Sequence, residues 1–488
     1  MRHLVLLIGG MMVCLSMTDA NGADGTGDAT ETYRQVETYK QVLVIKRATG
    51  TDDLQPPQLS KVYNGHNWAL STRWDDSNAN ALNVRRKMLE NGIRGTFYLN
   101  SRKPEKTPAT SLACKLTGAG ECSVGGHSVS HPKLPELPAN DAFRELMANR
   151  ITLEVLTDRP VNSLAFPYGA YQAKDRPEVL EAITKAVLRT GYHHCVYKNF
   201  VTRNPNLPKG LISTGHQVVP GDRQVNAEKF WASINKIRKF QKGYRKESDC
   251  IFLGVHPWQK GDALEDLANV MSDLRNWDDF WHCTHTEYAA FVKQRNYTTV
   301  TKTGTDTFTI ERPGAYDLGN DIALTLEFEG EGIATATVDG IVCPMRKAEG
   351  KTFLNISHAA RQGLPETIDE ATAGKSPAFP GLDTALTFDT ETGQVVYTLS
   401  NSAAAPLTDA VLTVSLPPSF EPGFFRQTRP DLKKGATWSA TIPLADEQAG
   451  DYWRKGNRYI AAQLDFILDG KRGRLFTTST VSPQLAAR

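Results

Sequence analysis

The sequence lacks a marked excess of charge of either sign. Its 488 residues include 56 lysines and arginines against 54 aspartates and glutamates, which gives a net charge of +2. A protein that tracks nucleic-acid phosphates usually carries a strong basic excess or a basic stripe. The near-balance therefore predicts no nucleic-acid partner.

Long apolar runs and paired cysteine motifs are also missing. Beyond the first 23 residues no segment reaches the roughly 18 uninterrupted apolar residues that a transmembrane helix needs, so we predict no membrane span. Six cysteines lie beyond residue 23, and none has the Cys-x-x-Cys spacing of a zinc or redox site. They are Cys114, Cys122, Cys195, Cys250, Cys283 and Cys343. Cys114 and Cys122 could close a short loop in an oxidising compartment, and several of the six could equally be buried thiols.

The N-terminal residues have the layout of a cleaved secretory signal. Met1-Arg2-His3 supplies a short positive start, the segment 4–17 is almost wholly apolar, and small residues follow up to Ala23. The apolar segment is too short for a spanning helix. We therefore predict a signal peptide over residues 1–23 and a soluble protein that is secreted or periplasmic. The alternative is a buried N-terminal helix.

The length predicts roughly two to four domains. Residues 24–61 begin polar and glycine-rich and are predicted as an N-terminal lead-in. Residues 62–298 alternate short apolar strands with helical patterns, which favours an α/β domain with a mostly parallel sheet or barrel. The predicted strands include residues 68–74, 96–99, 164–166 and 251–255, and the predicted helices include 82–89, 141–157, 177–189 and 262–274.

After residue 298 the sequence becomes typical of β structure. Residues 299–362 are rich in threonine, valine and isoleucine with period-two alternation, and we predict a β-rich region there. Residues 363–381 read as a linker because they are rich in glycine, proline and alanine. Residues 382–488 have the size and alternation of an immunoglobulin-like β-sandwich. No solenoid-type repeat is present.

Two short motifs carry the side chains of a metal site. His127 and His131 lie four residues apart in Gly-Gly-His-Ser-Val-Ser-His-Pro, and Asp75 and Asp76 are adjacent upstream. Two imidazoles and a carboxylate are ligands that a catalytic zinc-like ion takes. A second carboxylate beside the ligating one would leave a base next to a bound water. The alternatives are a helix-initiating turn at the two aspartates and ordinary loop histidines.

Further polar motifs follow predicted strands. In an α/β barrel the catalytic side chains lie where strands end and loops begin. Asp75-Asp76 follow the first strand, Phe166-Pro167-Tyr168-Gly169 closes another, and His256-Pro257-Trp258 follows the strand 251–255. This placement at several strand ends favours one shared site. His256 could also be a buried structural histidine, and Tyr168 could only pack the barrel mouth.

In this order the motifs resemble those of the polysaccharide deacetylases, the NodB-homology carbohydrate esterases. The family's Thr-Phe-Asp-Asp-Gly is matched by residues 73–77, and its His-Ser/Thr-x-x-His is matched fully by residues 127–131. Its Arg-x-Pro-Tyr is matched in part by residues 165–168, and its late Leu-x-His by residues 253–256 with one extra residue. The resemblance covers about residues 60–298. It implies a distorted (β/α) barrel, followed here by all-β regions.

The resemblance also implies roles. Asp76, His127 and His131 would bind a divalent ion, with Zn²⁺ expected, and Asp75 would be the base. The metal and the backbone N–H of Tyr168 would hold the oxyanion, and His256 would protonate the leaving group. The implied activity is removal of N- or O-linked acetyl groups from a polysaccharide or oligosaccharide.

The chain departs from the family pattern at three places. Ala165 stands where the family has the arginine that pairs with the base, and either Arg73 or Arg203 could replace it. Ser77 stands where glycine is usual, and no segment matches the Asp-x-x-Asp-Trp motif that tunes the acid histidine. These changes affect the expected rate and pH profile more than metal binding.

Two other functions stay open from the sequence. One is a non-catalytic carbohydrate-binding protein on a degenerate deacetylase barrel, and the other is a metal phosphoesterase, which often holds two metals. The remaining histidines offer rival metal sets but lack a paired acid at a suitable spacing, so structural or substrate-lining roles are favoured. They are His193, His194, His216, His282 with Cys283, and His285.

Overall fold

The computed structural model describes most of the chain between residues 36 and 481. The predicted signal peptide, residues 1–23, lies outside the described residues, as does Arg203. No helix in the described part of the chain is long and apolar enough to cross a membrane. The described residues are 36, 38–48, 54–101, 111–157, 159–197, 200–201, 207, 211–213, 215–239, 249–277, 279–359, 366–369, 379–389, 392–415, 420–421, 424–443, 445–446 and 458–481.

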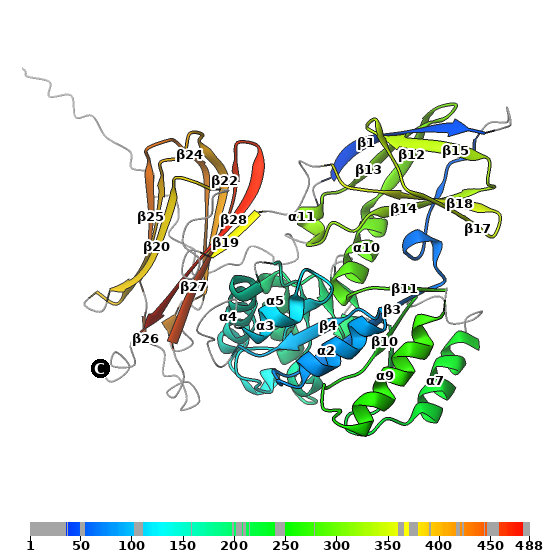
Figure 1. The fold of residues 1–488 in the computed structure, drawn as a ribbon. Coiled ribbons are helices and arrows are strands. Elements are labelled where there is room, and N and C mark those ends of the chain that lie inside the picture. Colours follow the sequence, from blue (N-terminus) through cyan, green and yellow to red (C-terminus); the bar gives the residue numbers. More distant parts are fainter. Residues whose placement is uncertain are drawn as a thin grey trace, which may run out of the picture.

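Residues 62–298, the parallel-sheet unit, are built around one sheet in the order β8-β7-β6-β5-β4-β3-β10-β9, with β11 also paired to β3 (Figure 1). Every strand pair of this sheet is parallel. The predicted parallel α/β barrel is therefore confirmed. Its strands are β3 Trp68–Asp75, β4 Thr96–Leu99, β5 Ser123–Gly126, β6 Ser163–Leu164, β7 His194–Cys195, β8 Ile212–Ser213, β9 His216–Val218, β10 Cys250–Leu253 and β11 Phe280–His282.

Helices cover this sheet, and local sequence signals set their ends. Pro177 opens α5 at a position where its missing N–H costs no hydrogen bond, and Gly191 ends the helix in a left-handed conformation. Thr284 and Glu287 form a capping box at the start of α10. The helices are α2 Ala81–Glu90, α3 Leu112–Thr117, α4 Ala139–Thr157, α5 Pro177–Thr190, α7 Ala227–Lys239, α9 Asp262–Arg275 and α10 His285–Tyr297.

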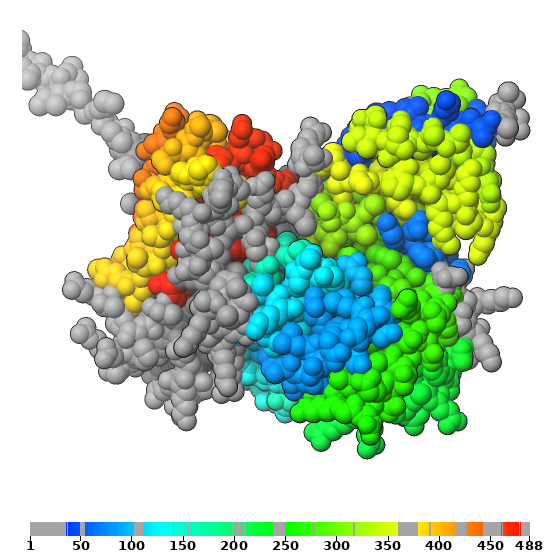
Figure 2. Space-filling view, in the orientation of Figure 1, coloured from blue at the N-terminus to red at the C-terminus, as the bar shows by residue number. Residues whose placement is uncertain are grey.

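The β-rich unit contains strands from the segments before and after the parallel-sheet unit. β1, Thr38–Arg47, lies between β13 and β15, and β2, Gln58–Leu59, pairs with β14. Figure 2 shows β1 in dark blue among the yellow-green strands of residues 299–356. The segment predicted as a lead-in therefore contributes strands to this unit. The other strands are β12 Thr299–Gly304, β13 Thr307–Pro313, β14 Leu324–Glu329, β15 Ile333–Val338, β16 Ile341–Val342, β17 Met345–Ala348 and β18 Lys351–Ile356, with the short helix α11 Ala315–Leu318 between β13 and β14.

Strict alternation in β1 explains its place. Its residues are alternately exposed and buried, so one face can pack on a core while the other meets solvent. Leu43 and Ile45 point into a cluster with Phe308, Leu326 and Phe328. The unit is therefore held by apolar packing between its two sheets.

A buried arginine joins the β-rich unit to the parallel-sheet unit. Arg312 of β13 donates to the backbone carbonyl of Ile356 at 2.8 Å and also contacts Gln294 of α10. Burial lowers the pKa of Arg312 to about 10, because its described partners are amides, carbonyls and His358 rather than carboxylates. Removing these acceptors would leave a buried charge without compensation.

The C-terminal sandwich, residues 366–481, has two sheets in the orders β19-β28-β27-β22-β24 and β20-β21-β25. They enclose a core that includes Tyr397, Leu412, Trp438 and Leu464. A strand, β19, lies within the predicted linker, and the immunoglobulin-like assignment stays a prediction. The strands are β19 Glu366–Asp369, β20 Leu382–Asp389, β21 Gln394–Asn401, β22 Leu407–Ser415, β23 Phe420–Glu421, β24 Phe424–Leu432, β25 Thr437–Pro443, β26 Ala445–Asp446, β27 Arg458–Leu468 and β28 Lys471–Val481.

A chain of polar side chains is buried inside the barrel. The Tyr98 hydroxyl lies 2.6 Å from Ser163 Oγ and 2.7 Å from His285 Nδ1, and Ser163 Oγ lies 2.6 Å from His194 Nδ1. Burial, with a contribution from the positive charge of Arg73, lowers the pKa of His194 to about 3. Burial, then the neighbouring His194, holds the pKa of His285 well below its usual value. Both imidazoles are therefore neutral in the folded protein at neutral pH.

We expect this pair to make the metal-free protein sensitive to acid. Between pH 6.5 and the lowered folded pKa values, the unfolded chain binds more protons than the fold, so the free energy of unfolding falls as pH falls. Each such histidine contributes about 1.4 kcal/mol per pH unit in this window. Urea unfolding of chelator-treated protein at pH 7, 6 and 5 measures the slope. His194→Asn should flatten it, and an equal slope in the variant would contradict the assignment.

Candidate active site

The two aspartates at the end of β3 serve different partners. Asp75 is the last residue of the strand and is buried, whereas Asp76 is half-buried and has a φ of +73°. Left-handed backbone is rare for a residue other than glycine and costs energy that surrounding contacts must offset. The turn directs Asp75 toward Arg73 and Asp76 toward two histidines, so adjacent carboxylates do not share one environment.

The histidine loop, residues 127–131, begins where β5 ends. A Cβ on Gly126 would lie 2.1 Å from the Tyr192 hydroxyl, so only glycine lets the end of β5 lie this close to the Tyr192 side chain. His127 Nδ1 lies 2.7 Å from the carbonyl oxygen of Ala165. A carbonyl only accepts, so Nδ1 carries the proton and Nε2 keeps its lone pair for a metal. Ser128 and His131 also have positive φ, +63° and +65°.

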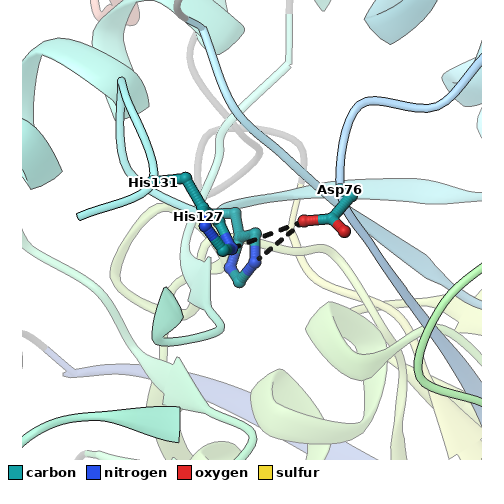
Figure 3. Close-up of side chains that lie close together, drawn as sticks. All are labelled: Asp76, His127 and His131. Carbon is teal, nitrogen blue, oxygen red and sulfur yellow. Dashed lines mark ion pairs between the residues drawn. The ribbon is translucent and has the colours of Figure 1, made fainter. Parts of the chain in front are cut away.

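Asp76, His127 and His131 converge on one point (Figure 3). Asp76 Oδ1 lies 3.6 Å from His127 Nε2 and 3.4 Å from His131 Nε2. Ligands of a tetrahedral zinc ion with bonds of about 2.0–2.1 Å lie about 3.4 Å apart, so the donor set fits such an ion. The neighbouring His127 lowers the pKa of Asp76, and burial lowers the pKa of His131. Both shifts favour the deprotonated forms that bind metals.

Arg73 makes the contact with Asp75 that the resemblance assigns to an arginine at position 165, where this chain has alanine. Its Nε donates to Asp75 Oδ1 at 2.9 Å and its Nη2 to Asp75 Oδ2 at 2.5 Å, while Nη2 also contacts the Tyr197 hydroxyl at 2.8 Å. Burial alone would lower the pKa of Arg73, but the charge of Asp75 and these hydrogen bonds outweigh it and raise the pKa. Arg73, one of the two arginines that the sequence offered, therefore contacts the expected base Asp75, and Arg203 lies outside the described residues.

His256 approaches the second carboxylate oxygen of Asp76 and has a carboxylate partner of its own. His256 Nδ1 lies 3.2 Å from Asp222 Oδ2, and its Nε2 lies 4.0 Å from Asp76 Oδ2. Its ring stacks on Trp258 with a centroid distance of 3.9 Å and an angle of 5°. Sequence reasoning missed Asp222 because it lies outside any Asp-x-x-Asp-Trp motif. The only signal was an acid directly after Pro220-Gly221 in the segment between a strand and a helix.

Tyr168 is exposed rather than packed into the barrel. It lies in the turn Pro167–Gly169 with a φ of +57°, and 67% of its surface is accessible. Its ring contacts that of His131 at a centroid distance of 4.5 Å. Phe166, by contrast, is fully buried. The turn therefore places Tyr168 at the rim of the site.

The rival histidines do not form a second site in the described residues. His194 and His285 belong to the buried chain with Tyr98 and Ser163, and His193 Nδ1 contacts the carbonyl oxygen of Leu318 at 3.2 Å. The group of Asp76, His127 and His131 is the one set of three potential ligands found within the part of the chain that the structure covers. The described cysteines are free thiols.

A family comparison agrees with the motifs. The sequence model of the polysaccharide deacetylase family matches residues 69–187, which include both aspartates, the histidine loop and Tyr168. Residues 69–187 belong to the polysaccharide deacetylase family. No curated protein sequence matches the chain. His256 and Asp222 lie beyond the matched residues of this deacetylase domain, so their roles rest on geometry and on the resemblance.

Solved structures similar to the deacetylase domain are distant. A family 4 carbohydrate esterase from Streptomyces lividans in complex with acetate is 14% identical, with 44% of this chain and 91% of that chain covered and a TM-score of 0.30. A peptidoglycan deacetylase from Bacillus subtilis is 15% identical, with 48% and 94% covered and a TM-score of 0.30. A family 4 pseudoenzyme is 16% identical, with 48% and 72% covered and a TM-score of 0.31.

We expect the deacetylase domain to bind one divalent ion. After chelation and back-titration, the wild-type protein should take up one Zn²⁺ per chain. Asp76→Asn and His131→Gln each remove an expected ligand. Loss of a residue that only hydrogen-bonds to a metal ligand raises the Kd by about 10- to 100-fold, so loss of a ligand itself should raise it by more. Isothermal titration calorimetry measures this.

Asp222→Asn is the matched control, because Asp222 contacts His256 and none of the three ligands. The zinc Kd of this variant should stay within about twofold of the wild-type value, which is small compared with the effect of losing a residue that hydrogen-bonds to a ligand. Unchanged zinc affinity in both ligand variants would contradict the assigned site.

Proposed function

We propose that the chain is a secreted, metal-dependent carbohydrate deacetylase that hydrolyses N- or O-linked acetyl groups on a polysaccharide or oligosaccharide. The observation that carries the proposal is the arrangement around Asp76. His127 and His131 lie near one carboxylate oxygen of Asp76, and His256, paired with Asp222, lies near the other. Asp75, paired with Arg73, lies beside His127. This supplies ligands, base and acid around a single point.

Asp75 is the proposed general base. Its Oδ2 lies 4.0 Å from His127 Nε2, at the edge of the ligand set. Arg73 occupies one lone pair on each carboxylate oxygen, and each oxygen keeps another that can accept a proton from water. A divalent ion held by Asp76, His127 and His131, proposed to be Zn²⁺, would acidify water and polarise the acetyl carbonyl. Asp75 then needs only to receive the proton at a fixed position.

His256 is the proposed general acid. Asp222 accepts from Nδ1, which directs Nε2 toward Asp76. Trp258 limits rotation of the ring through stacking. A proton on Nε2 would pass to the leaving amine or alcohol of the sugar.

The backbone N–H of Tyr168 is the proposed donor to the oxyanion. Preorganised backbone donors stabilise charge that develops in the transition state because they need no reorganisation. The exposed Tyr168 ring beside His131 offers an apolar face at the rim of the site. A sugar ring could stack there. The N-terminal signal-like segment supports export to the periplasm or the exterior.

Two alternatives make different predictions. A non-catalytic carbohydrate-binding protein would hold the ion and the glycan but release no acetate. The preserved base, acid and their partners Arg73 and Asp222 argue against it, since binding alone needs no such pairs. A phosphoesterase with two metals would show about two ions per chain.

Acetate release tests the proposal directly. The wild-type protein with Zn²⁺ should release acetate from at least one substrate in a panel of acetylated peptidoglycan, chitin oligomers and acetylated xylan, and a chelator should abolish release. Asp75→Asn and His256→Ala should each lower kcat by about 10²–10⁴, the usual contribution of general acid–base catalysis. No release from any substrate by zinc-loaded protein would favour the binding-protein alternative.

Arg73 should matter through its geometry as well as its charge. Arg73→Lys keeps the charge but loses the bidentate contact with Asp75. We expect kcat to fall by about 10- to 100-fold, since misplacing a catalytic group by about 1 Å can cost about 100-fold. Metal affinity should stay unchanged.

Arg85→Lys is the control for Arg73→Lys. Arg85 also contacts a carboxylate, that of Glu121, but this arginine is only partly buried and its partner is half exposed. The control should keep wild-type kcat. Equal kcat in Arg73→Lys and wild type would show that the bidentate pairing does not position the base.

A further inference from the structure

Helix α4 lies between the histidine loop and the C-terminal sandwich. It packs into the core of the deacetylase domain through Leu146 and Ile151 and also contacts β27. Figure 1 shows α4 on the side of the domain that faces β27. One rigid element therefore touches both the proposed metal ligands' loop and a separate unit of the chain.

Two residues one turn apart on α4 fix the backbone of the histidine loop. Glu145 accepts from the N–H of Ser130 at 2.9 Å and from the Ser130 hydroxyl, and its backbone carbonyl accepts from the N–H of Val129 at 3.2 Å. Asn149 Oδ1 accepts from the N–H of His127 at 3.0 Å. Three loop amides therefore donate to α4.

The loop needs this support because its conformation is unfavourable by itself. Ser128 and His131 both have positive φ. Such residues are energetically costly and persist only where surrounding contacts determine them. The bonds from Glu145 and Asn149 are those contacts on the α4 side.

The next turn of α4 is fastened to the sandwich by a buried charge network. Arg474 of β28 lies 3.6 Å from Glu154 and 2.7 Å from Asp465, and Arg150 donates to Gln463 of β27. Glu154 has only 2% of its side chain accessible. Glu154 pairs with Arg150 of its own helix at 3.5 Å as well as with Arg474, so this buried carboxylate links α4 to β28 within one network of charges.

Apolar packing reinforces this junction. Phe476 of β28 belongs to the same buried cluster as Leu146, Met147 and Ile151 of α4. Glu154 also accepts from the N–H of Val161 at 2.9 Å, which ties the end of α4 to the segment leading into β6. The sandwich is thus part of the packing that fixes where α4 lies.

We propose that the C-terminal sandwich holds α4, through Arg474 and Gln463, in the position from which Glu145 and Asn149 shape the histidine loop. Glu145 and Asn149 are positioning residues for the ligands His127 and His131. The proposal gives the sandwich a role in ordering the site, and its metal arm rests on the proposed function. Asn149 and Arg150 are neighbours on one helix, so a shift at the sandwich contact reaches the loop without an intervening flexible segment.

Hydrogen exchange of the full-length, metal-free protein tests the coupling. Arg474→Ala should speed exchange of the amides of residues 127–131 at least fivefold, and Gln463→Ala should act in the same direction with a smaller change. Arg429→Ala is the matched control, because this exposed arginine lies on β24 of the same sheet away from α4. It should leave the loop unchanged. Equal loop exchange in Arg474→Ala, Gln463→Ala and wild type would overturn the inference.

Zinc affinity supplies the second readout. Arg474→Ala should raise the Kd by about tenfold, within the range found for outer partners of metal ligands, and Arg429→Ala should not. The double variant Arg474→Ala/Asn149→Ala should raise the Kd by less than the product of the two single fold-changes, because both substitutions act through one helix. A fold-change equal to that product would show that the two sites act independently and would overturn the coupling. A wild-type protein that binds no zinc but shows the exchange effect would refute the proposed function and leave this inference standing.

Discussion

The buried ion pair between Arg73 and Asp75 is the interaction on which the site depends. Two adjacent carboxylates at a strand end would repel each other if both faced one cavity. Arg73, two residues earlier on the same strand, takes Asp75 as its partner, and the positive φ of Asp76 turns the second carboxylate to the histidines. Breaking such a buried pair usually costs about 3–5 kcal/mol. β3 and the residue that follows it thus supply the proposed base, its partner and a proposed metal ligand.

His256, the proposed acid, also has a partner that differs from the one in the family motif. Neither the family arginine nor the Asp-x-x-Asp-Trp motif is present, yet Asp75 has Arg73 and His256 has Asp222. Each replacement comes from a different position in the sequence from the one that the family uses. What is retained is a charge within hydrogen-bonding distance of each proposed catalytic group, and this is the property that a proton-transfer site requires.

The sequence was sufficient to predict the parallel sheet and the grouping of Asp76, His127 and His131. Strands such as Thr96–Leu99 are short apolar runs bounded by turn residues, and α5 has proline and glycine at its ends, so local signals determine them. Asp222 and the choice of Arg73 could not be predicted, because both depend on which segments meet in space. The place of β1 was missed for the same reason, since its partners are about 260 to 300 residues away in the chain.

That separation has a consequence for how the protein is made. β1 lies between β13 and β15, so both of its long edges pair with strands synthesised after the whole parallel-sheet unit. The entropy cost of closing such a loop grows only slowly with length, but the partners must exist before it can close. Until then Leu43 and Ile45 have no core to enter. The apolar face of β1 therefore stays without its core until most of the chain has been synthesised.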